Sequence, residues 1–94
     1  MKRGFIYILS NKKRNTFYVR VTNNLKKRIA EHKSGIGSKF SCKYKLTDLL
    51  YYGEIQGFRK AIDREKQLKN WDREWKINLI KSINPDLKDL FWDL

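Results

Sequence analysis

Three charged or ionisable side chains lie where the hydrophobic pattern calls for apolar residues, and all three are of kinds that act on phosphate esters. Arg28 and His32 are four residues apart, so they reach one spot if their segment is helical. Glu65 falls near the centre of the apolar side of a second amphipathic segment. A buried carboxylate is very costly alone, so Glu65 must be paired, hydrogen-bonded or bound to a metal ion.

Two tyrosines and a further arginine add to this set. Tyr7 lies in an apolar strand segment, and Tyr18 shares a strand face with Arg20 because alternate residues point to the same side. In phosphodiester hydrolysis a cation holds the phosphate, a carboxylate binds a divalent ion, and a phenol or imidazole transfers a proton. These residue types therefore suit that chemistry.

The same residues also have a purely structural interpretation. Arg28 and Glu65 would form an ion pair in the core, and His32 would be a hydrogen-bonded core histidine. The tyrosines would be ordinary half-buried residues of a sheet. The residue pattern alone leaves both interpretations open.

Hydrophobic alternation and turn residues predict the elements that would position these side chains. The predicted strands are Phe5–Leu9, Phe17–Val21 and about Asp48–Ile55, and the predicted helices are about Leu25–Lys33, Phe58–Asn70 and Arg73–Ser82. We expect Asn23 or Asn24 to cap the first helix and Asp72 the third, with a loop over Ser34–Ser41. The order β-β-α-β-α-α predicts an α+β domain with a small three-stranded antiparallel sheet packed with helices.

Length and composition limit the class of protein. The 94 residues predict a single domain over residues 1–94, and the tail with Trp92 is expected to fold back onto it. With 22 Lys+Arg against 10 Asp+Glu, the formal charge of +12 favours nucleic acid as the first partner and an anionic membrane as the second. The single Cys42 excludes an intramolecular disulfide.

The sequence shows no targeting or membrane segment. Met1-Lys2-Arg3 is followed only by a short apolar run, and no stretch approaches the roughly 20 apolar residues of a membrane helix. We therefore expect a soluble cytoplasmic protein that does not bind membranes. Its oligomeric state does not follow from the sequence.

Several short motifs occur in one order along nearly the whole chain. They are Phe5-Ile6-Tyr7-Ile8-Leu9, Tyr18-Val19-Arg20, the helix NLKKRIAEH from Asn24 to His32, Arg64-Glu65-Lys66-Gln67-Leu68-Lys69 followed by Trp71, and Asn84-Pro85. In this combination the chain resembles the GIY-YIG nuclease family, particularly its small stand-alone members and the N-terminal nuclease domain of excinuclease. The resemblance implies a GIY-YIG endonuclease-like fold and hydrolysis of DNA.

The resemblance also implies roles for single residues. Tyr7 or Tyr18 would be the general base, Arg28 would hold the scissile phosphate, and Glu65 would bind one Mg²⁺ or Mn²⁺ ion. His32 would carry a proton or contact phosphate. Substrate contacts would come from Arg20, Lys27 and Asn84, of which Asn84 helps to order the site. Nearby cations would lower the pKa of the tyrosine base.

Arg20 is the main departure from the family pattern, since it replaces the glycine of YIG. Glycine at such a position permits a positive φ or the close approach of another backbone. Arg20 adds a phosphate contact, occupies the phosphate or metal position and silences the site, or turns into solvent. The sequence leaves these three outcomes open, so a catalytically weak nucleic-acid-binding module remains the alternative to a nuclease.

Overall fold

Strand β1 (Gly4–Ser10) is the centre of the fold. It pairs antiparallel with β2 (Phe17–Thr22) on one side and with β3 (Asp48–Ile55) on the other, giving the strand order β2-β1-β3. The structure is a computed structural model that describes residues 3–36 and 39–94. The three predicted strands and the antiparallel sheet are confirmed.

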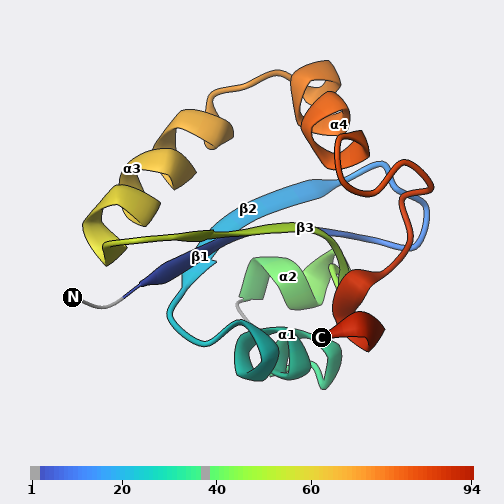
Figure 1. The fold of residues 1–94 in the computed structure, drawn as a ribbon. Coiled ribbons are helices and arrows are strands. Elements are labelled where there is room, and N and C mark those ends of the chain that lie inside the picture. Colours follow the sequence, from blue (N-terminus) through green and yellow to red (C-terminus); the bar gives the residue numbers. More distant parts are fainter. Residues whose placement is uncertain (1–2, 37–38) are drawn as a thin grey trace.

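The helices form a layer on each side of this sheet (Figure 1). Helices α3 (Phe58–Lys69) and α4 (Arg73–Lys81) cover one face. Helix α1 (Leu25–Lys33), the short helix α2 (Lys39–Lys43) and a C-terminal 3₁₀ turn, η1 (Leu90–Asp93), lie on the other. The structure is therefore an α+β fold in three layers, and the predicted fold class is confirmed.

Side-chain alternation along β1 divides the core into two clusters. Ile6 and Ile8 point toward α3 and α4, where they pack with Val19, Leu50, Leu68 and Ile80. Tyr7 and Leu9 point toward α1, where they pack with Leu25, Ile29, Leu46 and Leu49. Because β1 is buried on both faces, its period of two decides which side chains reach each helical layer.

The predicted helix caps are present. The side chain of Asn24 accepts a hydrogen bond from the Lys27 backbone at the start of α1, and that of Asp72 accepts one from the Trp75 backbone at the start of α4. Gly57 precedes α3 with a φ of 91°, a conformation that favours glycine.

Helix α2 was not predicted. The loop expected over Ser34–Ser41 ends early, because α2 begins at Lys39, while residues 37 and 38 lie outside the described part of the chain. The five residues of α2 are too few to show a helical period, which explains the miss.

The C-terminal tail folds back, as expected. Leu90 and Phe91 pack against the α1-side cluster, while Trp92 stays 74% exposed. Asp89 forms an ion pair with Lys33 at the end of α1 and accepts hydrogen bonds from the backbones of Leu49 and Phe91. Among the described residues, no helix has the length and apolar character needed to cross a bilayer.

Gly4 allows β1 to approach α3 closely, and this contact provides a stability test. A Cβ atom at Gly4 would lie 2.7 Å from the Cβ of Ala61, whereas one at Gly53 would meet nothing nearer than 3.6 Å. Gly4→Ala should therefore lower the free energy of unfolding by about 1–3 kcal/mol through overpacking. Gly53→Ala is the matched control and should cost less than about 1 kcal/mol. Urea denaturation of both variants measures the difference, and equal losses would contradict the close-approach explanation.

Candidate active site

The first part of the candidate site is a buried hydrogen-bonded chain between the sheet and α1. The Tyr7 hydroxyl lies 3.2 Å from Nε2 of His32, and Nδ1 of His32 lies 3.0 Å from Oγ of Ser41 in α2. All three residues are buried. The chain uses both ring nitrogens of His32, so its tautomer is coupled to the direction in which the two hydroxyls donate.

Burial sets the protonation of this pair. It lowers the pKa of His32 to about 4, with the charges of Arg28 and Arg20 acting in the same direction against Glu31. Burial also raises the pKa of Tyr7, although a hydrogen bond and the charge of Arg28 oppose it. The expectation that cations would lower the pKa of a tyrosine base is therefore wrong for Tyr7, because loss of hydration outweighs their effect. At neutral pH the site holds a neutral phenol beside a neutral imidazole.

The second part of the site lies along the edge strand β2. Arg20 pairs with Tyr7 across the β1–β2 ladder and therefore lies on the same face of the sheet. Its Nη1 lies 3.2 Å from the Tyr18 hydroxyl, and its guanidinium lies over the Tyr18 ring at 5.6 Å from the centroid. The Tyr18 ring is also edge-on to His32, with centroids 6.3 Å apart. Tyr7, Tyr18, His32 and Arg20 thus come together as the sequence suggested.

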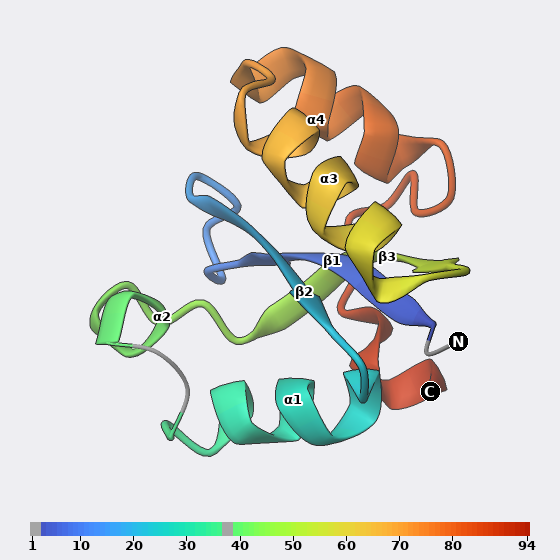
Figure 2. The same ribbon diagram turned by 90° about the vertical axis from the view of Figure 1, so that its left-hand side faces the viewer.

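Arg20 also reaches Glu65 of α3. Its Nε lies 3.6 Å from Oε2 of Glu65, whose side chain is 13% exposed. The other oxygen of that carboxylate, Oε1, lies 3.7 Å from Nζ of Lys69, one helical turn further along. Figure 2 shows β2 running between α3 and α1, so a long side chain on this edge strand can contact both layers. The backbone of Arg20 is in regular strand conformation without a positive φ.

These contacts correct the structural alternative drawn from the sequence. Arg28 does not pair with Glu65: its Nη1 lies 3.0 Å from Oε1 of Glu31, three residues along α1. Glu65 pairs instead with Arg20 and Lys69. Arg28 remains part of the site because its hydrogen bond and charge act on Tyr7. The spacing of Glu65 and Lys69 could have indicated their i,i+4 pair, but nothing in the sequence indicated Ser41.

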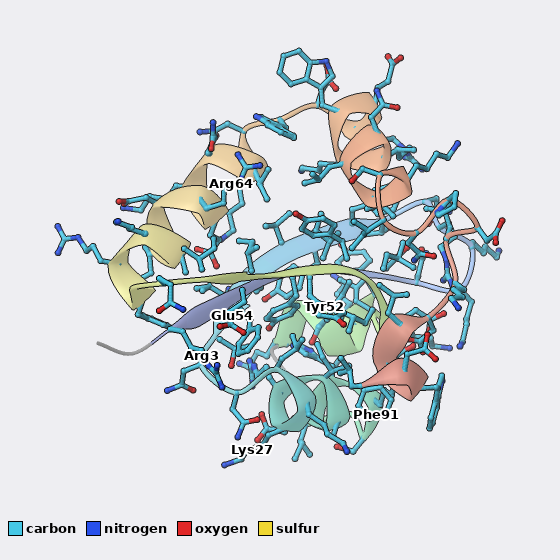
Figure 3. The ribbon with its side chains drawn as sticks, in the orientation of Figure 1. Arg3, Lys27, Tyr52, Glu54, Arg64 and Phe91 are labelled. Carbon is cyan, nitrogen blue, oxygen red and sulfur yellow. The ribbon has the colours of Figure 1, made fainter. Side chains whose placement is uncertain are left out.

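Lys27 and Asn84, two of the predicted substrate contacts, lie in different surroundings. Lys27 is exposed on α1 (Figure 3) and lines a polar hollow of ≈ 270 Å³ together with Arg28 and Glu31. Asn84 is buried, and its side-chain nitrogen donates to the backbone carbonyls of Leu50 and Lys88. Lys27 therefore lies next to the site, whereas Asn84 fastens the C-terminal segment to β3.

Comparison with known proteins places the chain in a family. Residues 3–78 match the family described as the GIY-YIG catalytic domain. The chain belongs to this family. The GIY-YIG domain is a nuclease domain, and its nucleases act on DNA and generally use divalent metal ions.

Similar GIY-YIG proteins include small chains of about the same length. A UPF0213 protein of Clostridium perfringens is 36% identical over 79 residues, covering 84% of each chain. A UPF0213 protein of Syntrophus aciditrophicus is 32% identical over 87 residues, covering 92% of this chain and 98% of its own. These names state no activity.

A solved structure has the same fold. The solution NMR structure of a UPF0213 protein from Bacillus halodurans matches with a TM-score of 0.58 and 23% identity, covering 93% of this chain and 92% of its own. This likeness supports the GIY-YIG-like α+β architecture.

The surroundings of Glu65 do not fit a resident divalent ion in this arrangement. Both carboxylate oxygens face cationic groups, Arg20 on one side and Lys69 on the other. Within the described residues, no group of three or more His, Cys, Asp or Glu side chains is placed to hold a metal ion. A divalent ion beside two fixed positive charges would be repelled, so we derive no catalytic step through one.

The low pKa of His32 leads to a direct test, because His32 is the only histidine in the chain. Its ring resonances in NMR should titrate near pH 4 rather than at the ordinary value of 6.5. Between these two values the unfolded chain binds a proton that the folded chain does not. Stability should therefore fall as the pH drops from 6.5 toward 4. In His32→Gln this histidine contribution to the pH dependence should vanish. A ring that titrates near 6.5 would contradict the buried neutral state.

Proposed function

We propose that this chain is an endonuclease that hydrolyses phosphodiester bonds of DNA. The observation that carries the proposal is the 3.2 Å contact between the Tyr7 hydroxyl and Nε2 of His32 beside Arg28. It joins a candidate base, a proton acceptor and a phosphate-binding cation in one small volume. Family membership supports the same reaction class.

A route for the proton follows from these contacts. As a water oxygen attacks phosphorus, the water gives a proton to the Tyr7 oxygen, and Tyr7 passes its own proton to Nε2 of His32. Neutral His32 is ready to accept it because its pKa lies well below 7. The bond from phosphorus to the leaving oxygen breaks, and Arg28 holds the phosphate while negative charge develops. The side chain of Arg28 is one-third exposed, so a phosphate can reach it.

This route predicts the effect of two substitutions. Tyr7→Phe removes the proton carrier and Arg28→Ala the phosphate contact, so each should reduce the cleavage rate by about 100-fold or more. Exposed Lys81→Ala is the charge control and should change cleavage little. Cleavage of labelled duplex, nicked and branched DNA is followed with Mg²⁺, with Mn²⁺ and with chelator. Full activity in Tyr7→Phe would rule out this route.

The contact between Arg20 and Glu65 favours a second candidate function, a DNA-binding module of low activity. Arg20 lies between Tyr18 and the carboxylate that the family resemblance assigns to the metal ion. If this arrangement persists on DNA, the guanidinium keeps the ion away from Glu65. Phosphate binding would remain because the surface stays cationic.

Arg20→Gly distinguishes the two candidates. If Arg20 silences the site, this variant should gain cleavage of about tenfold or more in Mg²⁺ or Mn²⁺, while Arg20→Lys, which keeps the charge, should not. If the native chain already cleaves and Arg20→Gly is slower, Arg20 serves the substrate instead. Absence of DNA binding by the native chain at low salt would overturn both candidates, because phosphate contacts are strongest there.

The proposed partner is DNA, bound by one domain over residues 1–94. The formal charge of +12 supports attraction to a polyanion. Cytoplasmic location stays a prediction.

A further inference from the structure

A second aromatic site lies away from the tyrosines, at the junction of α3 and α4. Trp71 and Trp75 meet edge to face with ring centroids 5.5 Å apart at an interplanar angle of 84°. Together with Asn78 and Leu79 they line an open, mostly apolar hollow of ≈ 390 Å³. The α4 members share one surface because Trp75, Asn78 and Leu79 are three and four apart on the helix.

The two tryptophans differ in their surroundings. Trp71 is half-buried and packs against the core cluster on the α3 side, which fixes its position. Trp75 is 58% exposed, so its ring is open to a ligand. Asn78 is exposed beside it and offers both a donor and an acceptor. A rigid wall, an accessible ring and an amide suit a flat aromatic ligand with polar edges.

Positive charge surrounds this hollow. The guanidinium of Arg64 lies over the Trp71 ring at 5.2 Å from the centroid, and Figure 3 labels Arg64 on α3. Residues 58–81 contain eight Lys or Arg against four Asp or Glu. Of the four acids, Glu65 is held between Arg20 and Lys69, and Asp72 caps α4. Asp63 and Glu74 complete the set, so the segment keeps a net positive charge that complements phosphate.

The hollow is also close to the candidate active site along the chain. Trp71 follows Glu65 by six residues, about 9 Å at the helical rise of roughly 1.5 Å per residue. Nucleotides of one DNA strand are spaced by roughly 3.4 Å along a duplex. A strand with a phosphate near Glu65 would therefore bring a base about three nucleotides away to the tryptophans.

We propose that this hollow binds an unpaired nucleobase, which stacks on Trp75 and contacts the amide of Asn78, while nearby cations hold the adjoining phosphates. Stacking on aromatic rings combined with arginine contacts is the common way in which proteins bind single strands. The hollow then selects DNA with an unpaired segment, such as a flap, a fork or an overhang. This choice of nuclease substrate rests on the proposed function, whereas binding of the base does not.

Fluorescence titration and affinity measurements test the proposal. A single-stranded oligonucleotide should quench tryptophan emission, and Trp75→Ala should weaken its binding by about fivefold or more. The same variant should change the affinity for blunt duplex by less than about twofold, because a paired base cannot enter the hollow. Trp75→Phe should retain most of the binding because it keeps an aromatic ring. Circular dichroism confirms that each variant is folded.

Trp92→Ala is the matched control, since Trp92 is an exposed tryptophan on the opposite side of the sheet. It should leave single-strand binding unchanged. Equal losses in Trp75→Ala and Trp92→Ala, or no loss in Trp75→Ala, would overturn the proposal. Self-association of the native chain that disappears in Trp75→Ala, without any effect of this variant on DNA affinity, would assign the hollow to a protein contact and overturn it as well.

The proposal and the proposed function can fail separately. If no DNA is cleaved but Trp75→Ala still weakens single-strand binding, the nucleobase site stands and the nuclease does not. If flapped and blunt DNA are cleaved at equal rates and Trp75→Ala changes neither cleavage nor binding, the nuclease stands and the nucleobase site does not.

Discussion

The burial of β1 on both faces is the constraint on which the rest of the structure depends. A strand in this position sends alternate side chains into two separate cores, so Tyr7 enters the α1 side because Ile6 and Ile8 occupy the other. A slip of one residue would exchange the two sets and remove Tyr7 from His32. The packing that stabilises the sheet is therefore the same packing that aligns the candidate base.

Electrostatics at the edge strand β2 adds what the core cannot provide. Tyr7 and His32 lie in a dry environment that keeps both neutral. Arg20 stands at the boundary of that environment, in contact with Tyr18 on one side and Glu65 on the other. In this way a neutral proton-transfer pair and a charged phosphate-facing border lie next to each other, and a single long side chain connects the two helical layers.

Local sequence signals predicted most of the fold. The alternation in β1, the capping residues Asn24 and Asp72, and the apolar side of α3 act over short distances, so they are visible in the sequence. The meeting of both tyrosines with His32 was expected from their faces and from the family resemblance. The partner of Glu65 was not, because Arg20 reaches it across a sheet edge, and no periodicity describes such a contact. Ser41 was missed for a similar reason, since α2 is too short to show a pattern.

The contacts of Asp89 have a consequence for the cooperativity of the molecule. Asp89 joins the last turn of α1 to the backbone of β3, and the rings of Phe91 and Trp92 lie 5.1 Å and 5.3 Å from the Lys33 ammonium. The helix that carries Arg28 and His32 is thus supported by residues far away in the sequence, and such contacts form late because a long loop must close first. Local opening of the tail would release the end of α1 with it, so the tail and the site belong to one unfolding unit although no residue of η1 touches Tyr7 or His32 through a described hydrogen bond.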